Sequence, residues 1–515
     1  MKSSCLMMSL VGMLSVGSAC AATFTVSSVD ELVNTLELCS SKDYGSGDVI
    51  QVAPGTYTVT EAISIRAKAL QIVGAGKGRT IFDGGSLDGV QTRVFKVSVG
   101  GVGISGISFQ NCNPETSADG GGAIFIGNSC YRFELTDCSF TNCRGQLGGA
   151  VASSIHYNEH DAQTTGVFPP RGNMGVISGC DFANCAATGT EAGGGAVAGA
   201  FWIENSTFTN CEAERYAAII HAGAHLMVTN CTFSDCRRKA TSTNRAAVWQ
   251  SKGNCENRIV DCSFTHMACG PLAGSDSKNM VVLDRCDIND CAGEYDETCA
   301  DNTNYRYSLF RNSNGTLRNS LVHGNQNPLI LDGGSVENCT IVDNVGGFFL
   351  PFRGNGTYPT IGLTNCLFYG NSVWDNGNYK SRGGPGLCWH QNAADVDVYK
   401  GIAMANCAFQ GAYYNASFNV LMGQDVTGES TRIAGLLDQK GPGFVDADNG
   451  NYRLTKRSVL IDQGLKTDSI ALGTDLAGSP RCFTVGKVEN APEALPDIGC
   501  FEYYNPIKPF TIRIR

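Results

Sequence analysis

One apolar position, most often phenylalanine, dominates the hydrophobic pattern of the chain and returns at intervals of about 30 residues. A small residue, usually cysteine, stands two residues before it, and Asn, Asp or Gly stands two residues after it, as in Cys180, Phe182 and Asn184. Alternating buried positions are typical of a β-strand, whereas Asn, Asp and Gly tolerate the left-handed backbone of a sharp corner. A self-similar unit of this length predicts a solenoid, in which each coil buries its apolar face against its neighbours. The eleven copies are centred on Phe109, Phe140, Phe182, Phe208, Phe233, Phe264, Ile288, Val322, Ile341, Phe368 and Phe409.

The residue after each corner extends this interior pattern. A corner resets the inward and outward alternation, so the next residue can also point inward. That column holds Cys143, Cys185 and Cys211, and later coils place asparagine there, as at Asn344. A buried asparagine amide can hydrogen-bond to the coil above or below.

Glycine pairs mark the second half of each coil. Each pair is followed by alanine and a branched residue, at 121–124, 148–151 and 194–197, which predicts a turn and another buried strand. Short strands joined by corners, with no helix-length segment in each repeat, predict a parallel β-helix of about 12 to 14 coils.

These repeats are similar to those of a known family. The repeat pairs two motifs: Phe-x-x-Asn, often with cysteine in place of the asparagine, and then Gly-Gly-Ala-Ile/Val. This pair resembles the repeats of polymorphic outer membrane proteins and of secreted bacterial β-helix proteins more widely. The resemblance covers roughly residues 24–425. It implies an all-β fold: a right-handed parallel β-helix with a short N-terminal capping helix and a small β-rich C-terminal module.

The two ends of the chain differ from the repeats. Residues 29–38 carry apolar residues at helical spacing, and we expect them to form the cap, because an open first coil would expose unpaired strand edges. From residue 441 the repeat stops, and the remainder resembles C-terminal modules that precede surface anchors. We therefore divide the chain into a signal peptide (1–22), a cap with the first coils (23–105), repeats (106–440) and a C-terminal module (441–515).

The first 22 residues have the order of a secretory signal. Lys2 precedes an apolar run at residues 6–16, and small residues follow, which predicts cleavage near Ala21 or Ala22. A lipoprotein attached through Cys20 is the alternative. No later run reaches the 18 or so apolar residues of a membrane span. We expect a secreted or cell-surface protein without a transmembrane segment.

Composition narrows the possible partners. Glycine accounts for 63 of the 515 residues, but only 15 prolines and no strict glycine period occur, which excludes collagen. The net charge of −10 and the absence of a Lys/Arg cluster disfavour a nucleic-acid partner. A polysaccharide or cell-surface glycan is the expected partner, and a monomer the expected state.

The chain contains 24 cysteines, and their role has two interpretations. An exported protein normally forms disulfides, but stacked interior cysteines can equally serve as small buried hydrophobes. Cys482 and Cys500 are the best candidates for a disulfide. No Cys/His spacing indicates a zinc site, and we expect no metal and no cofactor, except calcium if the protein is a lyase.

The longest insertion offers candidate chemistry. It follows Val151 and contains His156, Glu159, His160, Asp161 and Arg171. Imidazole, carboxylate and guanidinium groups on one loop could bind a sugar acid or transfer protons on a glycan, although a solvated polar loop explains them as well.

A second insertion carries aromatic residues. Trp374, Trp389 and His390 are candidate ligand-binding residues, since an exposed indole could stack on a sugar ring. A packed indole is the alternative reading.

Known polysaccharide-cleaving signatures are incomplete in this sequence. The polygalacturonase set of paired aspartates, His-Gly and Arg-x-Lys is absent, and His323-Gly324 falls on a repeat corner, so we discard that match. The hypothesis that we prefer from the sequence is a non-catalytic, adhesin-like surface protein that presents loops for carbohydrate or surface binding. The alternative is a polysaccharide lyase or glycoside hydrolase acting on an acidic polysaccharide, in a groove on one face near the candidate loop residues.

Overall fold

The structure is a computed structural model. It describes residues 21–41, 47–85, 92–114, 120–127, 130, 132–154, 175–189, 193–214, 216–221, 226–238, 246–250, 256–267, 272–274, 280–291, 310–311, 315–326, 329–330, 334–344, 348–350, 361–371, 387–389, 402–410, 414–415, 420–421, 424–425, 427–467, 470, 473–482 and 494–504.

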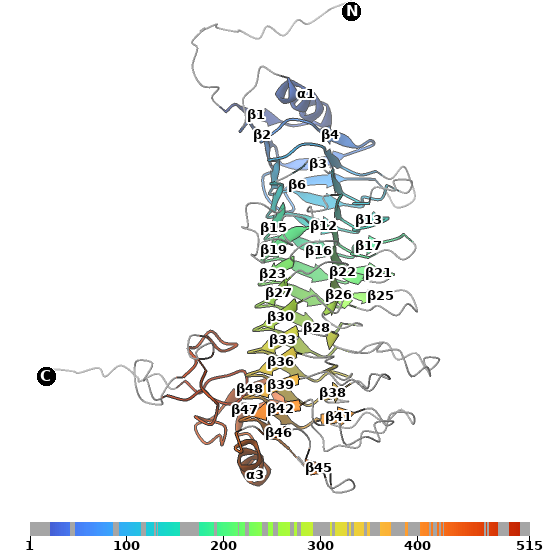
Figure 1. Ribbon diagram of the computed structural model, residues 1–515. Coiled ribbons are helices and arrows are strands. Elements are labelled where there is room, and N and C mark those ends of the chain that lie inside the picture. Colours follow the sequence, from blue (N-terminus) through green and yellow to red (C-terminus); the bar gives the residue numbers. More distant parts are fainter. Residues whose placement is uncertain are drawn as a thin grey trace, which may run out of the picture.

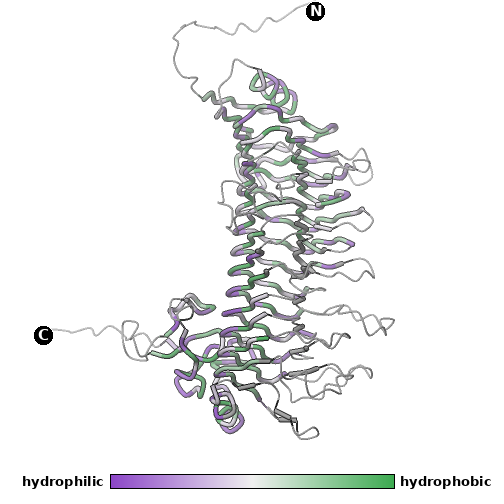
Figure 2. The backbone as a smooth tube through the Cα atoms, viewed as in Figure 1, coloured by the Kyte–Doolittle hydropathy of each residue, from purple (hydrophilic) through white to green (hydrophobic). Residues whose placement is uncertain are grey.

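The described chain winds into a parallel β-helix whose coils stack along one axis (Figure 1), as the repeat predicted. The second sheet has thirteen strands, one from each of thirteen coils, and the first sheet has fifteen, one from each of these coils and two more, β1 and β46, at its ends. Hydrophobic residues recur along the whole solenoid rather than around one centre (Figure 2).

The first sheet contains β1 (Thr23–Val26), β2 (Val49–Val52), β5 (Gln71–Val73), β8 (Gly103–Ser105), β11 (Glu134–Thr136), β15 (Gly175–Ser178), β19 (Phe201–Glu204), β23 (Leu226–Thr229), β27 (Glu256–Val260), β30 (Met280–Asp284), β33 (Gly315–Arg318), β36 (Gly334–Glu337), β39 (Ile361–Thr364), β42 (Ile402–Ala405) and β46 (Gln424–Asp425). The second sheet contains β3 (Gly55–Thr58), β6 (Thr80–Asp83), β9 (Ser108–Gln110), β12 (Ser139–Thr141), β16 (Asp181–Ala183), β20 (Thr207–Thr209), β24 (Thr232–Ser234), β28 (Ser263–Thr265), β31 (Asp287–Asn289), β34 (Leu321–His323), β37 (Thr340–Val342), β40 (Leu367–Tyr369) and β43 (Ala408–Phe409).

The third sheet closes the first part of the solenoid and contains β4 (Ile63–Ile65), β7 (Phe95–Val97), β10 (Ile124–Ile126), β14 (Val151–Ser153), β18 (Val197–Ala198), β22 (Tyr216–His221), β26 (Ala246–Gln250), β29 (Leu272–Gly274) and β32 (Phe310–Arg311). Smaller sheets contain β13 (Arg144–Gly145), β17 (Ala186–Ala187), β21 (Glu212–Ala213) and β25 (Arg237–Arg238), then β35 (Leu329–Ile330), β38 (Phe348–Leu350) and β41 (Leu387–Trp389), and the pair β44 (Tyr414–Asn415) and β45 (Val420–Leu421).

Two columns of left-handed corners frame the second sheet. The predicted column follows the strands of that sheet from β9 to β40, with a φ of 54° at Asn184 and 49° at Asn210. Another column, which the sequence analysis did not identify, joins the first sheet to the second, with a φ of 52° at Asn205 and 50° at Asn230. Asparagines of successive coils hydrogen-bond to one another in both columns. In the predicted column the Asn210 Nδ2 donates to the Asn184 Oδ1 at 2.7 Å. In the other column the Asn230 Nδ2 donates to the Asn205 Oδ1, also at 2.7 Å.

The phenylalanine column forms the centre of the core, as predicted. The rings of Phe140, Phe182 and Phe208 lie parallel with centroids 4.9 Å apart and are fully buried. This separation matches the spacing of neighbouring strands, so in-register stacking follows directly from the parallel pairing.

The second interior column changes from thiols to amides along the solenoid. Cys143, Cys185 and Cys211 are buried free thiols. Burial raises the pKa of the Cys143 thiol, whereas hydrogen bonds with the neighbouring thiols, together with burial, raise the pKa of the Cys211 thiol. Further along the axis, the Asn325 Nδ2 donates to the Asn344 Oδ1 at 2.9 Å, and the Asn344 Nδ2 to the Asn371 Oδ1 at 3.0 Å. The amides hydrogen-bond to one another, and these bonds offset the free-energy cost of burying polar groups.

Replacing Cys185 with alanine should cost about 1 kcal/mol, because only the small cavity left by the Sγ destabilises the fold. A disulfide at this position would cost about 2–4 kcal/mol when removed. Urea unfolding measures the change, and thiol titration of the denatured, unreduced protein counts reactive cysteines. Unreactive thiols throughout this column would contradict a stacked thiol core.

The predicted cap is the helix α1 (Val29–Ser40), which lies across the N-terminal end of the solenoid (Figure 1). The Ser28 Oγ accepts a hydrogen bond from the Glu31 backbone N–H, and the Glu31 carboxylate accepts one from the Ser27 backbone N–H, which satisfies two helix-start donors. Leu32, Leu36 and Cys39 bury the inner face of α1 on the first coils.

A C-terminal module packs on the outer side of the second sheet. Its described part contains α3 (Ser430–Lys440), β47 (Phe444–Asp446), a 3-10 turn (Ala447–Asn449) and β48 (Asn451–Leu454). The helix α3, which the sequence analysis did not predict, lies before the boundary expected at residue 441. Outward-facing Leu321, Val342 and Leu367 of the solenoid share a buried cluster with the module, which explains why these coils carry apolar residues on both faces.

A buried arginine, ion-paired within the module, also ties the module to the solenoid. The Arg481 Nη1 lies 2.8 Å from the Glu502 Oε1, with both side chains almost fully buried, and the Arg481 Nη2 donates to the Asn319 Oδ1 at 3.0 Å. Burial raises the pKa of Glu502 and of Asp497, and the Arg481 guanidinium opposes this rise.

Cys482 and Cys500 are free thiols in the structure and lie in two separate apolar clusters. The structure therefore does not contain the disulfide that we expected between them.

No helix in the described part of the chain is long and apolar enough to cross a membrane.

Candidate functional site

Most candidate residues from the sequence lie outside the described part of the chain. His156, Glu159, His160, Asp161 and Arg171 lie within 155–174, outside the described residues, as do Trp374 and His390. Trp389 lies at the end of β41, but its side chain is not described. Their roles therefore stay predictions.

The described chain gathers acid–base groups at a different place, where the module meets the corner after the second sheet. Asp290 and Asp343 occupy this corner after β31 and β37, and Gly324 occupies it on the coil between them. All three have a positive φ, between 50° and 64°, which Asp and Gly tolerate best.

The glycine separates the two carboxylates without placing a side chain between them. A Cβ on Gly324 would lie 2.8 Å from the Asp290 Oδ1, so the Asp290 carboxylate leans over this coil and needs the glycine there. Two coil steps put the corners of Asp290 and Asp343 about 9–10 Å apart along the axis. Both side chains are exposed.

An imidazole stands beside this pair. His323 precedes Gly324 at the end of β34, and its Nε2 lies 3.2 Å from the Asp287 Oδ1 on the preceding coil, an ion pair when the imidazole is protonated. That oxygen is shielded from solvent and accepts no aligned hydrogen bond in the described structure. A carboxylate oxygen with unused acceptor capacity often marks a functional site.

The module completes the cluster with a phenol. The Tyr452 Oη on β48 donates a hydrogen bond to the Asp343 Oδ2 at 2.9 Å, and the Tyr452 ring lies edge-on to His323, with centroids 5.0 Å apart. Burial raises the pKa of Tyr452, and the charges of Asp343, Asp290 and Asp287 raise it further. The phenol therefore stays protonated and keeps donating its hydrogen bond to Asp343.

The charge of this cluster is negative. Asp287, Asp290 and Asp343 supply three carboxylates, and the basic groups that the structure places beside them are the imidazoles of His323 and His266, whose Nε2 lies 3.9 Å from the Asp290 Oδ2. Within the described residues, no three His, Cys, Asp or Glu side chains come close enough together to hold a metal ion.

The sequence analysis missed this site because it considered each column alone. It discarded His323 as a corner residue, but the structure places His323 diagonally across from Asp287 of the neighbouring strand. Outward-facing Asp and His residues on adjacent copies of the repeat could have indicated this site from the sequence. No sequence signal could have identified Tyr452, because it lies 109 residues from its partner Asp343.

Comparisons with known proteins describe the fold. A family model for the right-handed beta helix region matches residues 148–295, which agrees with the predicted right-handed parallel β-helix. A search of curated proteins finds no match to the sequence.

The chain is also similar to solved structures. These include a mannuronic acid specific polysaccharide family 6 lyase enzyme from human gut microbiota (14% identity, TM-score 0.44, 81% of this chain and 94% of that chain). They also include the catalytic domain of a GH87 alpha-1,3-glucanase in complex with nigerose (12%, 0.35, 74% and 70%) and a pectate lyase (12%, 0.31, 95% and 98%).

These neighbours correct the functional hypothesis that we preferred from the sequence. We expected a non-catalytic, adhesin-like surface protein, whereas the neighbours are enzymes that cleave polysaccharides. The expectation was wrong because it rested on the lack of a complete catalytic motif in the sequence, and a solenoid can assemble a site from separate coils. At these identities the similarity concerns the fold, so the reaction must be argued from the site.

Proposed function

We propose that this protein is a polysaccharide-cleaving enzyme, specifically an inverting glycoside hydrolase that uses Asp290 and Asp343. The observation that carries the proposal is the placement of these two exposed aspartates on either side of Gly324, at corners about 9–10 Å apart along the axis. Inverting glycosidases place their two carboxyl groups about 6.5–9.5 Å apart, to leave room for the attacking water, and the axial spacing of the two corners lies at the upper end of that range.

The hydrogen bonds assign a role to each carboxylate. The Tyr452 hydroxyl donates to the Asp343 Oδ2 and holds this carboxylate in place, so we assign the role of general base to Asp343. It takes a proton from a water molecule whose oxygen then bonds to the anomeric carbon. Asp290 is the general acid and protonates the glycosidic oxygen as the bond from that oxygen to the anomeric carbon breaks.

His323 and Asp287 help to position Tyr452, which in turn orients Asp343. The imidazole contacts the Tyr452 ring and the Asp287 carboxylate, so it positions the phenol that orients Asp343. Rigid positioning of the catalytic base is a substantial part of its efficiency.

The charge of the cluster favours a neutral polysaccharide. A lyase must neutralise the carboxylate of an acidic sugar, usually with a cation or an arginine, whereas this cluster offers three carboxylates of its own. An acidic polysaccharide would be repelled unless a cation such as calcium intervened. We therefore propose a neutral glycan as the substrate.

Export suits this activity, since polysaccharides of this kind lie outside the cell. We propose that the protein is exported, because residues 1–22 place a charged residue, an apolar run and small residues in the order of a secretory signal. The kinship with polymorphic outer membrane protein repeats likewise stays a proposal.

The reaction can be tested on a panel of neutral glucans, xylans and mannans beside alginate and pectate. We expect new reducing ends on a neutral substrate, no ultraviolet absorbance from unsaturated products, and an initially inverted anomer by proton NMR. Unsaturated products would identify a lyase and refute the proposed hydrolysis. A retained anomer would refute the roles given to Asp290 and Asp343.

A further inference from the structure

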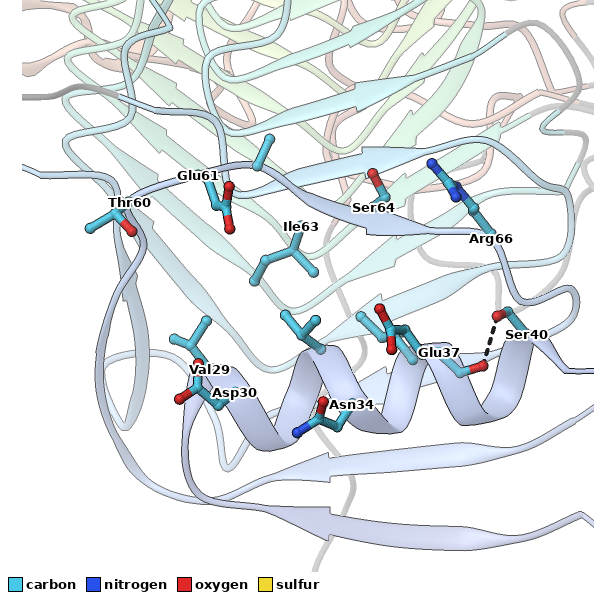
Figure 3. Close-up of a pocket in the computed structure, with 13 residues that line it drawn as sticks. Val29, Asp30, Asn34, Glu37, Ser40, Thr60, Glu61, Ile63, Ser64 and Arg66 are labelled. Atoms are coloured by element: carbon cyan, nitrogen blue, oxygen red, sulfur yellow. Dashed lines mark hydrogen bonds between the residues drawn. The ribbon is translucent and has the colours of Figure 1, made fainter.

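A groove runs between the cap helix α1 and the strand β4 at the N-terminal end of the solenoid (Figure 3). Its volume is about 560 Å³, and α1 contributes one wall while residues 60–66 contribute the other. The groove lies at the opposite end of the solenoid from α3 (Figure 1), far from the carboxylates proposed above.

The wall formed by β4 is an unpaired strand edge. β4 is the terminal strand of the third sheet and pairs only with β7 within the described structure. The Ile63 N–H donates to the Val94 carbonyl, and the Ile65 carbonyl accepts from the Ser98 N–H, so the backbone groups of Ile63 and Ile65 point toward the next coil. Backbone groups alternate along a strand, so those of Ser64 point toward the groove. An edge of this kind is a template for an added strand.

The wall formed by α1 is amphipathic. Val29 and Val33, one helical turn apart and partly exposed, contribute apolar surface to the groove, and Asp30 and Glu37 flank them. On the opposite wall, Glu61 adds a third carboxylate and Arg66 supplies one positive charge (Figure 3). The groove thus suits an extended segment with apolar side chains on one face and basic side chains on the other.

The chain itself contains such a segment. Residues 510–515, which lie outside the described residues, read Phe-Thr-Ile-Arg-Ile-Arg, with apolar residues at every second position and a threonine and two arginines at the alternate positions. This alternation is the pattern of a strand with one apolar face. We propose that residues 510–515 of a second copy of this chain add as a strand to the free edge of β4.

Chain length explains why the segment must come from a second copy. The Cys500 N–H donates to the Thr340 Oγ1 at 3.0 Å, which fixes this part of the module beside β37. β37 lies ten strands beyond β3 in the second sheet, or about 48 Å along the axis. The ten residues from Cys500 to Phe510 reach at most about 36 Å when fully extended. Docking therefore joins copies head to tail, in contrast to the monomer expected from the sequence.

Sedimentation velocity of the full chain over a range of concentrations tests the association. We expect the average mass to rise with concentration, and to fall again when a peptide of residues 505–515 is added in excess. Replacing Ile512 with proline removes a strand donor without changing the charge, and it should abolish association. A chain that stays monomeric at all concentrations and does not bind the peptide would overturn the proposal, as would an Ile512→Pro variant that associates normally.

A charge swap tests the location of the docking. Glu37→Lys/Glu61→Lys should weaken association about tenfold or more, and adding Arg513→Glu/Arg515→Glu to the same chain should restore it. The control variant Glu134→Lys/Asp448→Lys, which reverses two exposed carboxylates elsewhere, should associate as the native chain does. Loss in the control, or no recovery in the combined variant, would place the contact outside this groove.

Discussion

Replacing Asp343 with asparagine is expected to lower kcat by about 10²–10⁴-fold, with little change in KM. Asparagine retains the shape of the side chain and can still accept the Tyr452 hydroxyl, but it cannot take a proton from water. The corner backbone also tolerates this change, because asparagine occupies the same left-handed position on several other coils. Initial rates on the best substrate of the neutral panel measure the loss.

Asp137→Asn is the matched control for this variant. Asp137 is an exposed corner aspartate with a φ of 50° on the other corner column, where its carboxylate lies 3.4 Å from Lys77. This substitution should leave kcat within about twofold, because exposed ion pairs contribute little. If Asp343→Asn retains native activity, or if Asp137→Asn loses as much, Asp343 is not the base.

Arg481→Met should destabilise the docked C-terminal module by about 3–5 kcal/mol. The substitution leaves the Glu502 carboxylate buried without its cation and removes the hydrogen bond that Arg481 donates to Asn319 of the solenoid. An unpaired buried charge costs far more than the net value of the pair. Urea unfolding, with limited proteolysis of the module as a second readout, measures the effect.

Two further variants separate the buried charge from other causes. Arg432 forms an exposed pair with Glu429, so Arg432→Met should change stability by less than about 1 kcal/mol. Adding Glu502→Gln to Arg481→Met removes the stranded charge and should recover part of the loss. A loss at Arg481 no larger than that at Arg432 would show that the ion pair does not hold the module.

Undocking of the C-terminal module should also disturb the proposed catalytic site. Tyr452 belongs to the module and donates to Asp343, so undocking frees the proposed base from its phenol. We therefore expect Arg481→Met to lower activity along with stability, although Arg481 itself contacts no proposed catalytic residue.

The solenoid was readable from the sequence because its causes are local and repeated. An inward residue such as Phe182 alternates with its neighbours, and a corner residue such as Asn184 has its own preference for the left-handed region. Each coil repeats both signals and contacts only the next coil, so eleven imperfect copies support one interpretation. The cap at residues 29–40 was readable for the same reason, since helical spacing is a property of one segment.

The candidate site and the docked module were decided by the tertiary structure. Asp290 and Asp343 lie on either side of Gly324 only because successive coils stack in register, although their lengths differ. Tyr452 reaches Asp343 across 109 residues, and Arg481 reaches Asn319 across 162 residues. No local preference encodes such contacts, because they depend on where an irregular segment settles on the apolar outer face formed by Leu321, Val342 and Leu367. The sequence by itself therefore determined the scaffold and its cap, and packing between distant segments decided which side chains meet.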